Sequence, residues 1–331
     1  MFKEQFPRVE LDLWPTPIHK LKRYGDLIGL NNLYMKRDDI SLVGLGGNKL
    51  RKLEFWLGDA IQKSCDTILV AGGAQSNLVR LTAAACAKIG LKCIAIHNSA
   101  KPENLQGNTL LNKLFAAESL YYGNISEEER SSKTQELFKD LVSQGFKPYI
   151  INDEFIGTLG YTECAEEIYY QNKNQNLNIK NIVIVGAMAF TSSGFIYGNN
   201  LLPKPFTTHV ISVEYKKEKL DQLIQNKISQ LKQLTGVKPL YDYQKNTYTY
   251  EEYMGEGWSI PTKPAMQQIY NLAKTEAIVV DHVYNAKTLA GLAGLVKRGI
   301  LKKHEPTCII HTGGSPSVFG YADLIAEFSN N

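Results

Sequence analysis

Three basic residues crowd the start of one predicted helix, in the segment from Gly44 to Leu57. Lys49, Arg51 and Lys52 all fall in its first turn, where the helix dipole disfavours each cation by roughly 0.3 to 1 kcal/mol. Because the dipole and the neighbouring charges act together, we expect a lowered pKa for Lys49 and some neutral amine, which attacks carbonyl groups. The sequence therefore indicates a Schiff-base lysine beside a bound phosphate, although a solvated basic helix start fits this segment alone equally well.

A glycine turn and an apolar helix face position these charges. Gly44, Gly46 and Gly47 allow a flexible turn, and Asn48 is expected to cap the free amides at the start of the helix. The apolar residues that recur at helical spacing are Leu50, Leu53, Leu57, Ala60 and Ile61. This pattern predicts an amphipathic helix that begins at the lysine.

Three more loops follow predicted strands and carry groups that bind anions. The first, Gly72 to Asn77, contains the triplet Gln75-Ser76-Asn77, which on its own is typical of a helix cap. The second, Gly186 to Gly194, should cross into a helix and offer backbone amides and three hydroxyls to an anion. The third is the glycine loop Thr312 to Pro316. Ligands of parallel sheets lie at the carboxyl ends of the strands, so we expect these loops to share a cleft.

Strands and helices alternate along the chain, which predicts an α/β fold of parallel sheets with covered faces. The predicted strands span residues 33–36, 67–71, 93–97, 149–151, 181–185, 209–214, 278–281 and 307–311, with another near residue 120. The predicted helices span residues 78–89, 109–117, 158–171, 218–234, 264–274 and 287–298, and one more begins at the capping box Ser126-Glu127-Glu128-Glu129. Residues 171–180 are expected to form a surface loop. The sheet is expected to divide into a larger domain, 1–50 plus 160–331, and a smaller domain, 51–159.

The composition argues against proteins that bind nucleic acid or span a membrane. Of 331 residues, 44% are hydrophobic and 21% charged, the net charge is +4, and no Lys/Arg block is present. No apolar run approaches the roughly 20 residues that span a bilayer. The irregularly spaced tyrosines of residues 241–253 are interpreted as packing and loop residues rather than as a surface for stacking bases. The charged residues 1–10, the scattered cysteines and the histidine spacing predict a cytoplasmic protein with reduced thiols and no metal site.

Five motifs occur in order along nearly the whole chain. They are Lys36-Arg37-Asp38-Asp39, Gly46-Gly47-Asn48-Lys49 with Arg51-Lys52-Leu53-Glu54, Gln75-Ser76-Asn77, Asp281 through Val283-Tyr284, and His311-Thr312-Gly313-Gly314. Each is weak alone, but together they resemble the pyridoxal-phosphate enzymes of the tryptophan-synthase-beta fold. Within that fold they are similar to the D-cysteine desulfhydrase and aminocyclopropane-carboxylate deaminase group. The resemblance implies a two-lobed protein with three-layer α/β/α domains, a pyridoxal 5'-phosphate cofactor, a small amino-acid substrate and a homodimer.

The resemblance also implies a role for each matching residue. Lys49 would bind the cofactor covalently and move the substrate proton, with Ser76 and Tyr284 as the other catalytic residues. The phosphate would lie against Lys52, Ala189, Phe190, Thr191, Ser192, Ser193 and Gly194. Asn77 would contact the phenolic oxygen of the cofactor, and Thr312 would lie near its pyridine nitrogen. The substrate would contact Gln75, Ser76, Asn77, Trp258 and Tyr284.

Several positions depart from the family pattern. Met188 and Phe190 stand where a glycine-rich phosphate loop is usual, and Ile151-Asn152 replaces a glycine pair. We expect the ring of Phe190 to turn into the core and leave the amides free, the alternative being that it occupies the space of the anion. The remaining departures are Leu78 for His or Gln, Trp258 for a tyrosine, His282 for a proline and Ala286 for a glycine.

Three functions are compatible with these residues. The first is β-elimination from D-cysteine, which gives pyruvate, ammonia and hydrogen sulfide. The second is deamination of 1-aminocyclopropane-1-carboxylate to 2-oxobutanoate and ammonia, and the third is a non-catalytic protein that binds the cofactor or an amino acid. The deaminases typically carry Glu and Leu where this chain has Asn285 and Thr312. Thr312 favours the desulfhydrase, whereas Asn285 matches neither group.

Overall fold

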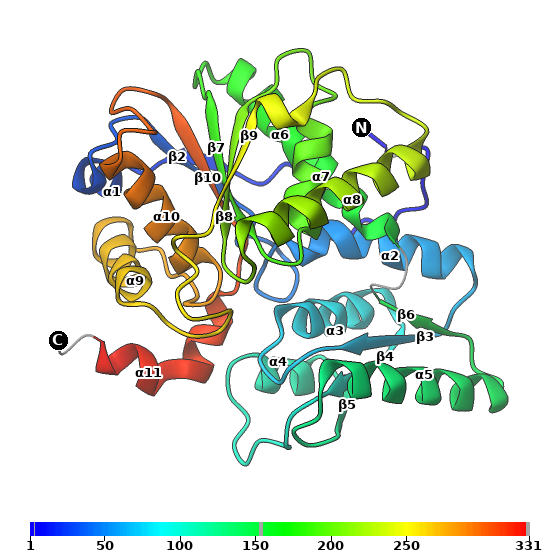
Figure 1. The fold of residues 1–331 in the computed structure, drawn as a ribbon. Coiled ribbons are helices and arrows are strands. Elements are labelled where there is room, and N and C mark those ends of the chain that lie inside the picture. The colour runs from blue at the N-terminus through cyan, green and yellow to red at the C-terminus, as the bar shows by residue number, and fades with distance from the viewer. Residues whose placement is uncertain (3, 152–154, 329–331) are drawn as a thin grey trace.

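The strands form two separate sheets in the computed structural model, which describes residues 1–2, 4–151 and 155–328 (Figure 1). The larger sheet contains, in spatial order, β1 (Ile18–Lys20), β2 (Leu33–Arg37), β10 (Thr307–His311), β7 (Asn181–Gly186), β8 (Thr207–Ser212) and β9 (Thr247–Tyr250). The smaller sheet contains β5 (Glu118–Tyr121), β4 (Lys92–His97), β3 (Thr67–Ala71) and β6 (Pro148–Ile150). Only the β1–β2 pair among the described strands is antiparallel.

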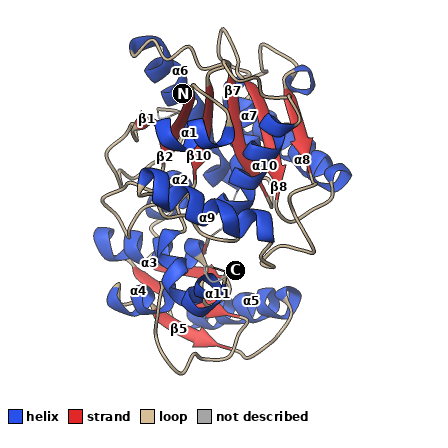
Figure 2. Ribbon diagram, turned by 90° about the vertical axis from the view of Figure 1, so that its left-hand side faces the viewer, coloured by secondary structure: helices blue, strands red, loops and turns tan. Residues whose placement is uncertain are grey.

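Helices cover both faces of each sheet. They are α1 (Lys22–Ile28), α2 (Lys49–Gln62), α3 (Asn77–Ile89), α4 (Asn108–Leu114), α5 (Glu127–Ser143), α6 (Gly160–Asn174), α7 (Phe190–Asn199), α8 (Lys217–Thr235), α9 (Lys263–Glu276), α10 (Asn285–Lys297) and α11 (Ala322–Glu327), with 3-10 turns at η1 (Phe155–Leu159), η2 (Tyr243–Lys245) and η3 (Ser315–Tyr321). Helices α9 and α10 lie on one side of the larger sheet and α6 to α8 on the other, while α3 and α5 flank the smaller sheet (Figures 1 and 2). The predicted two-lobed α/β fold of parallel, three-layered sheets is therefore confirmed.

Helix α2 lies where the two lobes meet, and its apolar face belongs to one continuous core. Leu50, Leu53 and Leu57 are fully buried in a cluster that includes Ile68 of the smaller sheet and Ile184 of the larger one. Burial of each such side chain contributes roughly 1.5–3 kcal/mol. The helix that carries Lys49 is thus fixed against both sheets at once.

The strand pattern agrees best with prediction where strands are buried and apolar. Strands β3 and β10 have the predicted bounds, because every residue of Thr307–His311 and nearly every residue of Thr67–Ala71 is enclosed by covered faces. The predicted strand 278–281 is wrong, since that segment has no ladder partner among the described residues. Part of the tyrosine stretch, interpreted as packing and loop, is instead the edge strand β9, and residues 171–174 belong to α6 rather than to a surface loop.

The four strands of the smaller sheet all lie between residues 67 and 150. We therefore propose domain boundaries of 1–50 plus 160–331 and 51–159, since the chain leaves the larger lobe once and returns to it once. Across the described residues, no helix combines the length and the apolar character needed to cross a bilayer.

Candidate active site

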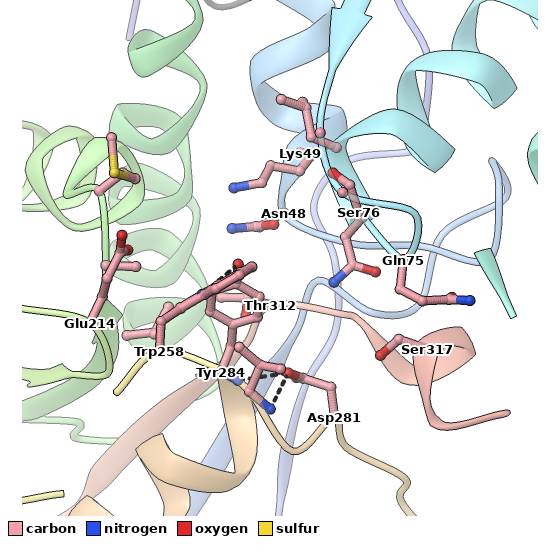
Figure 3. Close-up of a pocket in the computed structure, with 18 of the residues that line it drawn as sticks. Asn48, Lys49, Gln75, Ser76, Glu214, Trp258, Asp281, Tyr284, Thr312 and Ser317 are labelled. Carbon is pink, nitrogen blue, oxygen red and sulfur yellow. Dashed lines mark hydrogen bonds between the residues drawn. The ribbon is translucent and has the colours of Figure 1, made fainter. Parts of the chain in front are cut away.

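A cavity of about 580 Å³ lies between the lobes, at the carboxyl ends of the parallel strands. It is lined by the start of α2 and by the loops after β3, β7, β8 and β10. In Figure 3, Lys49 and Asn48 project into a space bounded by Ser76 on one side and Glu214 on the other. The helix start at Lys49 and the three loops chosen from the sequence therefore meet in one place, as expected for parallel sheets.

Twelve of the fourteen predicted site residues line this cavity: Lys49, Lys52, Gln75, Ser76, Asn77, Ala189, Phe190, Thr191, Ser192, Trp258, Tyr284 and Thr312. Ser193 and Gly194, the other two, do not line the cavity, and their contact with the phosphate stays a prediction. Both lie in the first turns of α7 and are fully enclosed. A Cβ atom on Gly194 would come 2.3 Å from the carbonyl oxygen of Thr158, so this glycine allows α7 to pack closely against that carbonyl.

Backbone contacts fix the glycine turn before Lys49. Gly46 has φ +71°, and a Cβ atom there would lie 1.9 Å from the carbonyl oxygen of Asp39, so only glycine fits. The guanidinium of buried Arg80 donates to the carbonyl of Gly46 at 3.0 Å. The turn also bonds to the loop after β10, where the amide of Asn48 donates to the carbonyl of Thr312 at 3.0 Å. These contacts set the direction in which α2 starts.

Asn48 does not cap α2 with its side chain. The backbone of Asn48 is already helical, and its side-chain nitrogen Nδ2 donates to the Thr191 hydroxyl at 3.0 Å instead. The expected cap is therefore wrong. The side chain ties the start of α2 to the start of α7, so the two groups of residues expected around the phosphate are held together.

The three cations in the first turn of α2 have different surroundings. Arg51 is 2% exposed and pairs with Asp38 and Glu167, each at 2.8 Å, so protein carboxylates supply its anion. Burial lowers the pKa of Lys49 to about 8, and Glu214 opposes that shift. Burial is thus the main cause, rather than the dipole and like charges expected from the sequence. Burial, Lys49 and a further lysine hold the pKa of Lys52 well below its usual value.

The Gln-Ser-Asn triplet combines both roles considered for it. The hydroxyl of Ser76 accepts from the Val79 amide at 3.4 Å and so caps α3, yet Ser76 also lines the cavity. The side-chain oxygens of Gln75 and Asn77 accept from Asn108, each at 2.9 Å. The Asn77 amide nitrogen is therefore left to donate towards the cavity.

A hydrogen-bond network behind the cavity joins the start of α10 to the loop after β10. Asp281 accepts from the amides of Val283, Tyr284 and Asn285 and from the Asn285 side chain, the last at 2.6 Å. The Asn285 oxygen accepts from the amide and the hydroxyl of Thr312, at 3.0 and 3.2 Å. Asn285 therefore orients Thr312, a role that its sequence position alone did not indicate.

Two aromatic residues close the lower side of the cavity (Figure 3). The indole nitrogen of Trp258 donates to the Tyr284 hydroxyl at 3.1 Å. Burial raises the pKa of Tyr284, so its hydroxyl keeps its proton at neutral pH. Because the hydroxyl oxygen already accepts from Trp258, its own hydrogen is available for a group in the cavity.

Phe190 does not turn into the core as expected. It is the first residue of α7, after Ala189 at φ +61°, and its half-buried ring lies on the cavity wall. The ammonium groups of Lys227 and Lys52 lie 4.0 and 5.4 Å from the ring centroid. Lys227 belongs to the middle of α8 and to none of the sequence motifs. Glu214 does line the cavity and was missed, although its place at the end of the predicted strand 209–214 is a usable signal.

A family model described as pyridoxal-phosphate dependent enzyme matches residues 9–313. The chain belongs to this family. It is 34% identical over 326 residues to a D-cysteine desulfhydrase of Serratia proteamaculans, with 96% of each chain covered. A crystal structure of an ACC deaminase homologue matches with a TM-score of 0.87 at 33% identity, over 98% of this chain and 97% of that one. Threonine deaminase from Solanum lycopersicum matches in fold, with a TM-score of 0.69 at 14% identity over 95% and 83%.

Pyridoxal phosphate is the cofactor of this family, and the cavity residues fit it. Lys49 supplies an amine whose pKa of about 8 leaves a minor fraction of it neutral near physiological pH. Lys52 is 2% exposed and faces the cavity with no carboxylate within ion-pair distance among the described residues. Such a buried cation needs an anion. Helix α7 points its free amides at the same space. Within the described part of the chain, no cluster of His, Cys, Asp or Glu is arranged to hold a metal.

Proposed function

We propose that this pyridoxal-phosphate enzyme removes the β-substituent of a small D-amino acid, with D-cysteine as the leading substrate. D-Cysteine and water would give pyruvate, ammonia and hydrogen sulfide. The observation that carries the proposal is Lys49, a partly neutral amine facing Ser76 and Tyr284 across one cavity. The similarity to a D-cysteine desulfhydrase over 96% of the chain supports it.

The surroundings of Lys49, Ser76 and Tyr284 suit each of them to a different step of the reaction. When bound, the cofactor withdraws electrons from the α-carbon of the substrate. The Lys49 amine, with a pKa of about 8, can accept the α-proton and return it. The Ser76 hydroxyl at the start of α3 can bind the substrate carboxylate together with the free amides of that helix. The Tyr284 hydroxyl holds a proton that can pass to the departing sulfur.

The second candidate, deamination of 1-aminocyclopropane-1-carboxylate, is supported by the similarity to an ACC deaminase homologue. The proposal favours the desulfhydrase because Thr312 places a hydroxyl, oriented by Asn285, where the resemblance puts the pyridine nitrogen. A third candidate, a non-catalytic binder, is supported by the bulk that Met188 and Trp258 add to the cavity wall.

A product assay separates the three candidates. The purified protein is incubated with D- and L-cysteine, D- and L-serine and 1-aminocyclopropane-1-carboxylate, and pyruvate, 2-oxobutanoate and sulfide are measured. We expect sulfide and pyruvate in equal amounts from D-cysteine, and at least tenfold less from L-cysteine. Release of 2-oxobutanoate from the cyclopropane substrate alone would favour the deaminase. Cofactor binding without any product from the panel would favour the non-catalytic binder.

A further inference from the structure

Lys227 does not itself line the cavity, but its ammonium group lies against Phe190, which does and which is predicted to contact the phosphate. We propose that Lys227 is a second cation for the phosphate of the cofactor and that the ring of Phe190 holds it in position. The inference rests on the cofactor-binding part of the proposed function. It adds to the site a residue from α8, a helix that contributed no predicted site residue.

The geometry brings two lysines to one aromatic ring. Lys227 on α8 and Lys52 on α2 come from helices far apart in sequence, and their ammonium groups lie 4.0 and 5.4 Å from the centroid of Phe190. Phe155 packs beside the same ring at 6.1 Å between centroids. The ring face attracts cations through its quadrupole, so Phe190 draws both ammonium groups towards the first residue of α7.

The two charges near this ring lack a carboxylate partner in the part of the chain that the structure describes. Neither Lys52 nor Lys227 has a carboxylate within ion-pair distance among the described residues. Lys227 is half-buried, and burial lowers its pKa. The charge of Lys227 also contributes to the lowered pKa of Lys52, after burial and Lys49. Two like charges that approach one ring are stabilised by an anion between them, and a phosphate monoester carries up to two negative charges near neutral pH.

The loop before α7 gives a reason for a second lysine. Side chains at Ala187, Met188, Ala189 and Phe190 limit how closely a phosphate can approach the backbone amides. Met188 is fixed beside the loop, since the Tyr215 hydroxyl donates to its sulfur at 3.1 Å. A lysine ammonium reaches the phosphate without close backbone approach. Lys227 therefore replaces part of the anion binding that glycines would provide.

The competing explanation is that the aliphatic chain of Lys227 only covers Phe190, as long side chains commonly do. The two explanations differ in what the charge does. If Lys227 binds the phosphate, its charge should matter for pyridoxal 5'-phosphate and not for pyridoxal, which lacks the phosphate. If Lys227 only packs, the affinity for both ligands should be the same whether the side chain at position 227 is charged or neutral.

The test compares Lys227→Met with the parent by spectrophotometric titration of both ligands into full-length apoprotein. Lys232→Met is the matched control, because Lys232 is exposed on the same helix and the variant has the same net charge. We expect Lys227→Met to weaken pyridoxal 5'-phosphate binding five- to twenty-fold and pyridoxal binding less than two-fold, and the control to change neither. Lys227→Arg should remain within about three-fold of the parent for both ligands.

Two outcomes would overturn the inference. Unchanged pyridoxal 5'-phosphate affinity in Lys227→Met would show that Lys227 only packs against Phe190. Equal weakening for both ligands would show damage to the fold. In either case the parent would still bind the cofactor and yield product, so the proposed function would stand. A parent that bound neither ligand would instead contradict the proposed function itself.

Discussion

At the scale of single residues, the site depends on how three neighbouring cations are surrounded. Arg51 is neutralised by the carboxylates of Asp38 and Glu167, Lys49 faces Glu214 across the cavity, and Lys52 lies at the position expected for the phosphate. The sequence identified all three as unusual because they share one helix turn. It could not tell them apart, since their partners Asp38, Glu167 and Glu214 come from other elements.

The pKa of Lys49 predicts how cofactor capture depends on pH. Only the neutral amine attacks the aldehyde, so capture should become faster as pH rises and level off above a midpoint near 8. An ordinary lysine would give a midpoint about two units higher. Stopped-flow absorbance of apoprotein mixed with the cofactor between pH 6.5 and 10 measures this midpoint. A midpoint above 10 would contradict the burial of Lys49.

Loss of charge at Arg51 and at Lys52 should have opposite effects on the stability of the apoprotein. Arg51→Met leaves the buried Asp38 and the partly buried Glu167 without their main partner and should lower the free energy of unfolding by about 3–5 kcal/mol. Lys52→Met removes a buried cation that has no carboxylate partner in the described chain, so the apoprotein should be at least as stable as the parent. Urea unfolding of both apo variants makes the comparison. A similar loss of stability in both variants would contradict the surroundings described for Arg51 and Lys52.

At the scale of elements, Asn285 joins the start of α10 to the loop after β10. Asn285→Ala removes the acceptor for Thr312 and a donor to Asp281, so the apoprotein should lose about 1–3 kcal/mol in free energy of unfolding. Its kcat should fall more than its cofactor affinity, because Thr312 would lose its orientation. Thr312→Val, which removes only the hydroxyl, should lower kcat with a smaller loss of stability. An unchanged kcat in both variants would exclude this network from the chemistry.

The helices and strands that a local sequence pattern marks were predicted from the sequence, whereas those that depend on long-range contacts alone were not. Buried apolar strands such as β3 and β10 and capped helices such as α5 carry their own local signals, and all were predicted. The short edge strand β9 depends on pairing with β8, and the Val280 segment is buried without joining a ladder. Asn48 was expected to cap its own helix, but Thr191 on a distant helix binds its side chain instead. These long-range contacts have no local pattern, and for the same reason Lys227 was missed.

At the scale of the whole molecule, the cavity draws its lining from both lobes, so a ligand that fills it should stabilise the whole fold. Because the cofactor contacts should exist only in the folded state, cofactor at a hundred times its Kd should add about 2.7 kcal/mol to the free energy of unfolding. Urea unfolding with and without pyridoxal 5'-phosphate measures this gain, and pyridoxal at equal concentration should give less. No gain with either ligand would mean that the cofactor does not bind in the folded cavity.

We also expect a cytoplasmic homodimer, and sedimentation of the holoprotein checks the dimer.

The central claim is that Lys49, inside this cavity, is the residue that binds the cofactor covalently. Borohydride reduction of the yellow holoprotein, followed by peptide mass mapping, tests it in one measurement. We predict a single labelled peptide that carries the cofactor on Lys49, and loss of that label in Lys49→Ala. A label on Lys52, on Lys227 or on any other lysine, or a protein that never takes up the cofactor, would contradict the account.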